Sequence, residues 1–416
     1  MDLACTEREP RGRMRTLVIA DEYPWPENSG SRVRLVTTLL ALRTLGPIEL
    51  FSVVPQGRQD FDPPDPEVML ENVGRAAYDQ TGAGLGPALA RPWLPFSLSI
   101  RERPAVQALL GEFVSGRYDL VWLFGIRSWL LAGDPSMAPT VLDLYDLEDQ
   151  KIRARLSVPE PPKTSVTQRM RGWAARQYSE EEARRWRRLQ IRAGRDVSSV
   201  VVCSQLDAER YGGRRADTLA IVPNGYPLVD VPTELPPVGT PPVILFQGTL
   251  RYPPNAQAAR FLVGEVGPAI RELVPEARIR LVGLSTPALA DLDDPPEVAL
   301  VGQVDDIGIE LAGADIVLVP IRFGSGTRVK IVEAFAHRIP VVSTTLGAEG
   351  LGAVDGEHLL IGDDPDALAR ACAQLLSDEA LRTRIVDAAY ELFLTSLQRD
   401  RVEDAVRTVA RSAVAT

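Results

Sequence analysis

The sequence predicts an α/β protein made of two doubly wound, Rossmann-like domains that face each other across a cleft. Its 416 residues are too many for one ordinary hydrophobic core. Short apolar runs alternate with helical periods along both halves, a pattern typical of parallel sheets flanked by helices. Between the halves, residues 227–242 hold six prolines in sixteen positions, and this density predicts a stiff linker without regular structure.

The first half, residues 1–226, has the pattern of one such domain. It opens with a strand at Thr16–Ala20, a loop rich in Pro and Asn, and a helix over residues 30–45 whose apolar residues recur with helical spacing. A long helix rich in Arg and Glu is expected over residues 165–193. Further strands are expected at residues 48–53, 120–124, 140–144 and 197–203.

The second half, residues 243–385, repeats this order. Strands are expected at residues 243–246, 279–282, 298–301, 316–319, 341–343 and 359–361, with helices at 256–273, 328–337 and 366–376. The remaining residues, 386–416, form an amphipathic segment expected to pack back on the first domain. Ligands of open α/β sheets bind at the carboxyl ends of the strands, so a cleft is expected where both sheets end.

Composition excludes several classes of protein. Hydrophobic residues make up 45% of the chain and charged residues 25%, as in folded globular proteins. The net charge of −10 argues against a general nucleic-acid binder. Three cysteines without a CxxC pair fit a reducing cytoplasm and exclude a disulfide framework or a zinc ribbon. Arginine greatly outnumbers lysine, which indicates a bacterial source with a GC-rich genome. The sequence contains no uninterrupted run of about 18 apolar residues, the length that a membrane-spanning helix needs.

One cluster of basic residues has two interpretations. Its members are Arg184, Arg185, Arg187 and Arg188. A solvated helix face is the simpler interpretation, and a patch for peripheral membrane contact is the alternative.

The most informative segment is residues 320–340. A strand runs into a loop with Gly324 and Gly326, and a helix is expected to open near Thr327. Glycines let a ligand approach the backbone, and the free N–H groups of a helix start favour an anion such as a diphosphate. Arg328 and Lys330 place positive charge in that first turn, where the helix dipole disfavours it, which suggests a function. An ordinary βα turn with surface cations is the competing interpretation.

This segment and seven others resemble, in the same order, family 4 glycosyltransferases, which have the two-domain GT-B fold. The other seven are residues 28–32, 222–225, 246–255, 281–283, 301–305, 314–320 and 341–350. The resemblance implies that the second domain binds a nucleotide sugar and the first an acceptor. It further implies a retaining transfer of a hexose-type sugar to a hydroxyl of a glycan or secondary metabolite, without a metal or other cofactor.

The resemblance also implies roles for individual residues. Arg328 and Lys330 hold the donor diphosphate, and the carboxylate of Glu333 accepts hydrogen bonds from the ribose. Contacts to the donor are expected from Gly30, Ser31, Gly248, Arg251, Val304, Gly324, Ser325, Gly326 and Thr327. Contacts to the sugar or the acceptor are expected from Asp143, Asp146 and Glu349.

The sequence departs from the family pattern at two points. Ser325 stands where the family often has a glutamate, eight positions before Glu333, and both histidines, His337 and His358, lie in the second half. Ser325 leaves a silent nucleotide-sugar-binding subunit as an alternative. A nucleotide-sugar epimerase on the same fold is a second alternative, and the lack of a histidine in the first half counts against it. A nicotinamide dehydrogenase is disfavoured because no GxGxxG follows the first strand.

Overall fold

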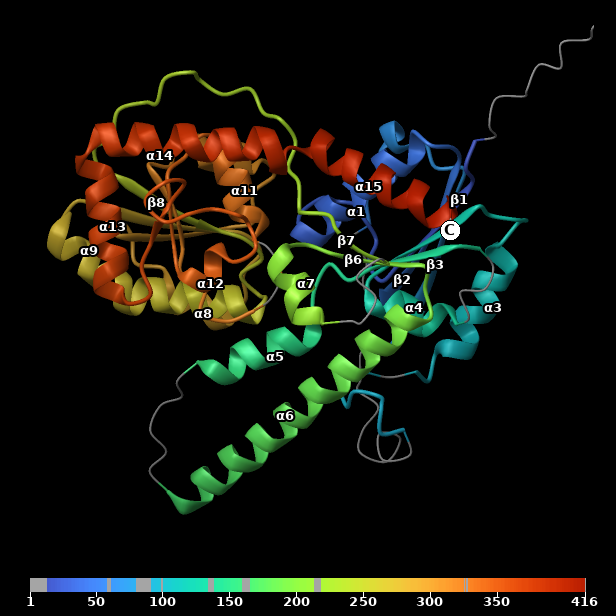
Figure 1. Ribbon diagram of the computed structural model, residues 1–416. Coiled ribbons are helices and arrows are strands. Elements are labelled where there is room, and N and C mark those ends of the chain that lie inside the picture. Colours follow the sequence, from blue (N-terminus) through green and yellow to red (C-terminus); the bar gives the residue numbers. More distant parts are fainter. Residues whose placement is uncertain are drawn as a thin grey trace, which may run out of the picture.

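The computed structural model describes residues 13–57, 61–79, 91–98, 100–133, 138–158, 165–212, 218–324, 326 and 328–415. The chain forms two parallel β-sheets that lie side by side, each packed against helices (Figure 1). This arrangement confirms the predicted α/β class and the two Rossmann-like units.

The first sheet has seven parallel strands in the order β3-β2-β1-β4-β5-β6-β7. They are β1 (Thr16–Ala20), β2 (Ile48–Pro55), β3 (Asn72–Tyr78), β4 (Leu120–Phe124), β5 (Thr140–Asp143), β6 (Ser199–Val202) and β7 (Leu219–Ile221). The helices of this half are α1 (Gly30–Arg43), η1 (Pro66–Val68), α3 (Arg103–Phe113), α4 (Ile126–Ala132), α5 (Glu148–Ser157), α6 (Val166–Arg195) and α7 (Gln205–Tyr211). The central strands β1 and β4 are buried along their whole length, because both faces of the sheet are covered.

The second sheet has six parallel strands in the order β10-β9-β8-β11-β12-β13. They are β8 (Val243–Gln247), β9 (Arg278–Val282), β10 (Val298–Gly302), β11 (Ile316–Val319), β12 (Val341–Ser343) and β13 (Leu360–Ile361). The helices of this half are α8 (Pro253–Phe261), η3 (Leu262–Val266), α9 (Gly267–Leu273), η4 (Pro287–Leu292), α10 (Ile307–Ala312), α11 (Val329–Ala336), α12 (Thr345–Ala348), α13 (Pro365–Ser377) and α14 (Glu379–Leu392). Its six strands match the six apolar runs expected from the sequence.

The chain crosses between the two halves twice, and the two crossings lie together. Tyr226, just before the proline-rich segment, accepts a hydrogen bond from the backbone N–H of Arg399 at 2.9 Å and donates its own N–H to Leu397 at 3.0 Å. The second crossing consists of η5 (Phe393–Leu397) followed by α15 (Arg399–Ala415). Figure 1 shows α15 lying against α1, and Val402 and Val406 are buried in the same core as Leu35.

None of the helices in the described part of the chain has both the length and the apolar character needed to cross a lipid bilayer.

Candidate active site

Each sheet has a switch point, where the strand order reverses: between β1 and β4 in the first and between β8 and β11 in the second. Ligands of doubly wound sheets bind just outside the carboxyl ends of the strands at such points. Gly248 directly follows β8, and the glycine loop that holds Gly324 and Gly326 follows β11. The structure therefore brings these sequence-predicted donor residues together at the second switch point.

Lys330 lies in the first turn of α11, beside the end of β8. Its ammonium donates a hydrogen bond to Oδ1 of Asn255 at 2.9 Å and lies 4.4 Å from the ring centre of Phe246. A Cβ atom at Gly248 would lie 2.9 Å from this nitrogen, so a larger residue would displace the end of the lysine side chain, and the φ of +136° favours glycine here. Burial, reinforced by the neighbouring Arg328, lowers the pKa of Lys330 to about 7.

Arg328 precedes the first residue of α11 and folds back over the glycine loop. A Cβ atom at Gly324 would lie 2.9 Å from Nη2 of this arginine, and the φ of Gly324 is +127°. Burial lowers the pKa of Arg328. The first turn of α11 contains no acidic residue that would compensate these two cations. Free N–H groups, the helix dipole and two cations together make this helix start suited to a polyanion.

Glu333 lies one turn further along α11, facing the linker. Its carboxylate accepts hydrogen bonds from Tyr226 and from Nε2 of Gln247, the latter at 3.4 Å. Burial raises the pKa of Glu333, while these hydrogen bonds and Lys330 oppose the rise. A carboxylate held in this way, on the same helix as the two cations, has the position needed to accept hydrogen bonds from a ribose.

Residues of the first half lie close to the start of α11. Gly30, the first residue of α1, is so close to α11 that a Cβ atom on it would lie 2.8 Å from Cγ2 of Val329. Gly326 lies on the other side of the loop, where a Cβ atom would be 3.5 Å from the carbonyl oxygen of Tyr145 and 3.7 Å from Oδ1 of Asp146. The predicted site residues Gly30, Gly326 and Asp146 are therefore gathered around one helix start.

Asp146 belongs to a charged cluster of the first half, next to the glycine loop. It forms an ion pair with Lys151, which also lies 3.5 Å from a carboxylate oxygen of Glu148. Burial opposes the charged form of Lys151, but Asp146 and Glu148 raise its pKa, so its ammonium stays charged. Glu148 in turn lies 3.3 Å from Nη1 of Arg127.

Asp21 joins this cluster and was not identified from the sequence. It directly follows β1, and Tyr145 donates a hydrogen bond to its Oδ1 at 3.1 Å. Burial raises the pKa of Asp21 to about 7, with Arg127 opposing the rise. Gly125, which follows β4, makes room for it, since a Cβ atom there would lie 2.1 Å from Oδ2 of Asp21. The detectable signal was the position of Asp21 and Gly125 at the ends of two strands that meet at a switch point.

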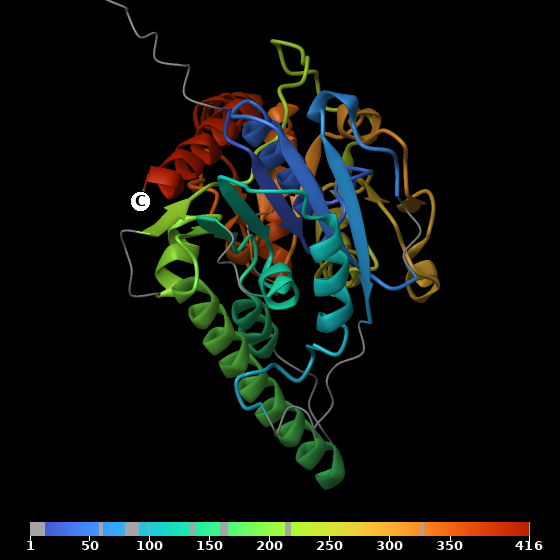
Figure 2. The ribbon, with the colours of Figure 1, turned by 90° about the vertical axis from the view of Figure 1, so that its right-hand side faces the viewer.

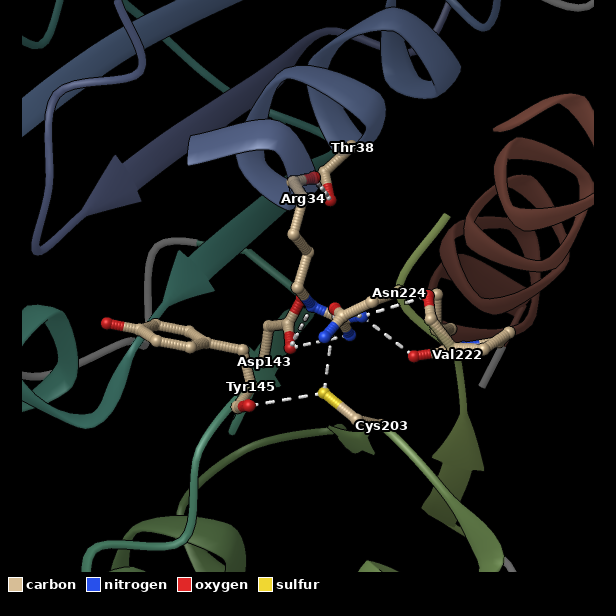
Figure 3. A network of polar contacts seen from close by, with 8 residues as sticks. Arg34, Thr38, Asp143, Tyr145, Cys203, Val222 and Asn224 are labelled. Carbon is tan, nitrogen blue, oxygen red and sulfur yellow. Dashed lines mark hydrogen bonds and ion pairs between the residues drawn. The ribbon is translucent and has the colours of Figure 1, made fainter. Parts of the chain in front are cut away.

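Asp143 lies elsewhere and has a structural role (Figure 3). Its side chain is fully buried and forms an ion pair with Arg34, whose Nη2 lies 2.9 Å from Oδ1. Arg34 also donates to the carbonyl of Val222 at 2.8 Å and to Oδ1 of Asn224 at 3.0 Å. A carboxylate with no exposed surface and an arginine partner is closed to a sugar, so the expected sugar contact at Asp143 is replaced by a buried ion pair that joins α1 to β5.

The remaining predicted residues occupy the margins of the site. Ser31 donates to the carboxylate of Glu22, and Arg251 is exposed with its N–H bonded to the carbonyl of Leu284 at 3.0 Å. Val304 follows β10 and packs against the core of the second half. Glu349 accepts two hydrogen bonds from Arg210 of α7, at 2.8 and 3.0 Å, and thereby links the two halves. Ser325 and Thr327 lie outside the described residues.

Comparison with known proteins identifies the second half by its sequence. Residues 241–378 match the family described as "Glycosyl transferases group 1". The phosphatidyl-myo-inositol mannosyltransferase of Mycobacterium leprae is 39% identical over 98 residues, which are 23% of this chain and 26% of that protein. The matched segments span between 26% and 35% of the length of the curated relatives.

Comparison with solved structures identifies the fold of the whole chain. The crystal structure of HepE from Anabaena in complex with UDP and glucose superposes with a TM-score of 0.62 at 16% identity, over 96% of this chain and 100% of that chain. Sucrose-phosphate synthase from Thermosynechococcus elongatus superposes with a TM-score of 0.66 at 16% identity, over 97% of this chain and 100% of that chain. The chain therefore has the GT-B fold, and residues 241–378 match the glycosyl transferases group 1 family.

Proposed function

We propose that this protein is a retaining glycosyltransferase that moves a hexose from a nucleoside diphosphate sugar to a hydroxyl of a glycan or secondary metabolite. One observation carries the proposal: Arg328 and Lys330 stand at the start of α11, with no carboxylate in the first turn, and Glu333 lies one turn beyond. The two cations suit the diphosphate of a nucleotide sugar, and the carboxylate suits its ribose. The similarity of residues 241–378 to glycosyl transferases group 1 supports the same function.

In the proposed reaction the diphosphate rests on the first turn of α11 between Arg328 and Lys330. The bond between the anomeric carbon and the phosphate oxygen breaks as the acceptor oxygen bonds to that carbon from the same face. The acceptor's proton passes to the departing phosphate oxygen, so no protein nucleophile is required. The two cations stabilise the charge that develops on this oxygen, a form of electrostatic catalysis that needs no metal ion.

The acceptor is proposed to enter from the first half. Asp146, Lys151, Asp21 and Tyr145 form a polar wall opposite the glycine loop, with donors and acceptors suited to sugar hydroxyls. Gly30 and Gly326 let this wall approach the donor closely. Close contact of the two halves would also keep water from the anomeric carbon and limit hydrolysis of the donor.

A thermal-shift panel tests the donor site. The purified chain is heated with UDP, GDP, ADP and their diphosphate sugars in the presence of a chelator, and UDP comes first because HepE was crystallised with it. A ligand that binds only the folded state raises Tm by mass action. We expect one nucleotide series to raise Tm in the wild type and in Arg278→Ala, and to fail in Lys330→Ala and Glu333→Gln. Arg278 is a matched control, since it is an exposed cation at the opposite end of the same sheet.

Turnover then separates a transferase from its alternatives. Release of the nucleoside diphosphate from the preferred donor should be stimulated by an acceptor and lost in Lys330→Ala. Binding without any release of diphosphate across a panel of acceptors would favour the silent subunit. Conversion of the donor sugar into its epimer would favour the epimerase. Absence of any nucleotide binding at millimolar concentration would contradict the proposal as a whole.

A further inference from the structure

The N-terminal part of α6 projects away from both sheets. Figures 1 and 2 show the helix extending beyond the body of the protein at this end. We call residues 166–178 the α6 tip. Ser165 caps it and forms a capping box with Gln168, and every residue of the tip except Gly172 is exposed. The C-terminal half of the same helix is packed, with Trp186 and Leu189 buried in the core.

The α6 tip presents an apolar stripe to solvent. Val166 is 63% exposed, Met170 67% and Trp173 67%, and their spacing of four and three residues puts them on one face of the helix. Tyr178, at the inner end, differs from them because its ring stacks on Phe96 at 4.8 Å. Contiguous large apolar side chains on a projecting surface mark an interaction site rather than an ordinary helix face.

Basic residues border this stripe. Helical geometry places Arg169 beside the stripe, about 40° from Trp173, and Arg171 about 100° round the helix from Met170. Arg176 lies one turn inward, where it pairs with Glu180 at 3.2 Å. No acidic residue occurs between 165 and 179, although the whole chain carries a net charge of −10. The positive charge of the tip is therefore opposite to that of the protein to which it is attached.

We propose that the α6 tip docks on an anionic lipid surface. Val166, Met170 and Trp173 enter between the headgroups, and Arg169 and Arg171 contact lipid phosphates. An apolar stripe with a tryptophan and flanking arginines is the pattern of helices that lie in a membrane interface. A stable protein interface needs about 800 Å² from each partner, which a single convex helix end supplies poorly, whereas lipids surround such an end. The net negative charge of the chain leaves the tip as the part that an anionic surface attracts.

The basic run Arg184 to Arg188 is not this docking site. Arg185 is buried, donates to the carbonyl of Leu94 at 3.0 Å and stacks over Phe96 at 4.1 Å, so the expectation that the whole run is a solvated face is wrong for this residue. Arg184 and Arg188 are 54% and 56% exposed and lie beside Glu181. They belong to the part of α6 next to the body and provide a matched control.

Vesicle co-sedimentation of the full-length protein tests the inference without any sugar. The vesicles contain either phosphatidylcholine alone or phosphatidylcholine mixed with phosphatidylglycerol. We expect the wild type to bind the anionic vesicles, and Met170→Gln/Trp173→Gln and Arg169→Glu/Arg171→Glu each to weaken binding about tenfold or more. Arg184→Gln/Arg188→Gln should bind within about twofold of the wild type, and Trp173→Phe should retain binding because it keeps the apolar ring. Circular dichroism checks that each variant is folded.

Two results would overturn the inference. One is that the wild type fails to bind the anionic vesicles, or binds vesicles of phosphatidylcholine alone equally strongly. The other is a dimer, seen by light scattering without lipid, that Met170→Gln/Trp173→Gln dissolves, because the stripe would then be covered by a second copy of the chain. The proposed transferase activity is unaffected by either result, since this test does not depend on it.

Discussion

Gly30 and Val329 bring the two halves of the protein into contact, each as the first residue of a helix. A Cβ atom on Gly30 would lie 2.8 Å from Cγ2 of Val329, closer than side-chain carbons tolerate. The N-termini of α1 and α11 therefore meet at the proposed donor site, and the positive ends of two helix dipoles face the same space. An anion bound there would be stabilised from both halves of the protein.

Substitution of Gly30 by alanine should separate the two helix starts. The added methyl group must push Val329 away, and a displacement of this kind can reduce the rate of a positioned reaction by about tenfold to a hundredfold. We expect kcat/KM for transfer to fall while Tm changes little. The double variant Gly30→Ala/Val329→Ala should recover most of the activity, because it removes the clashing methyl groups. Full activity of Gly30→Ala alone would show that the contact is dispensable.

Lys330 should make donor binding dependent on pH. The pKa of its ammonium is lowered to about 7 by burial and by Arg328, so half of the free protein lacks this charge at neutral pH. A bound diphosphate favours the protonated form, and binding therefore takes up a proton. The Kd for the nucleoside diphosphate should rise about tenfold for each pH unit above 7. Calorimetric titration in buffers of different ionisation enthalpy measures both the Kd and the proton uptake.

Lys330→Arg provides the control, since a guanidinium stays charged over this range. Its Kd should be nearly independent of pH between pH 7 and 9.

The pH dependence of stability provides an independent check that the pKa of Lys330 is lowered in the folded protein. The unfolded chain binds one more proton than the folded chain between about 7 and the ordinary lysine value of 10.5, so this group makes the free energy of unfolding rise with pH in that window. A Lys330→Met variant should lose that slope.

The strands were predictable where they are central and apolar, and the failures have physical reasons. β3 and β7 are edge strands, and β3 has only Ala76 buried and includes Gly74 and Arg75, so no apolar run marks it. Arg328, Lys330 and Glu333 were predicted together because one short helix and its N-cap hold all three. Asp143 looked like a free strand-end carboxylate because its partner Arg34 lies 109 positions earlier. Asp21 escaped notice because only the sheet topology brings it beside Tyr145.

The Arg34–Asp143 pair should be important for stability and not for transfer. Removing one partner leaves a buried charge uncompensated, so Asp143→Ala should lower the free energy of unfolding by about 3–5 kcal/mol. In Arg34→Met/Asp143→Leu the loss should be smaller than the sum of the two single losses, because the charges interact directly. Urea unfolding measures these values. Below its unfolding transition, Asp143→Ala should keep kcat/KM within about twofold of the wild type. A much larger loss would support the sugar contact that the sequence predicted for Asp143.

Arg210 and Glu349 offer a way to decide between two roles for a predicted sugar contact. Glu349 follows α12 in the second half and is held by both Nη atoms of Arg210 from α7, at 2.8 and 3.0 Å. A two-point ion pair between the halves would favour their closed arrangement. Both side chains are partly exposed, at 29% and 25%, so the pair contributes at most about 1 kcal/mol to stability.

Exchanging the two charges distinguishes an ion pair that holds the two halves together from a direct contact with the transferred sugar. If Glu349 acts only through Arg210, then Arg210→Glu and Glu349→Arg should each raise KM for the donor about threefold to fivefold, because each leaves like charges facing one another and the pair is worth at most about 1 kcal/mol. The double variant Arg210→Glu/Glu349→Arg should then return KM close to the wild-type value, since the attraction is restored with its direction reversed. If Glu349 instead binds the transferred sugar, the double variant stays as impaired as Glu349→Arg, and kcat falls with it. Steady-state kinetics of the four proteins with one donor therefore distinguishes the roles.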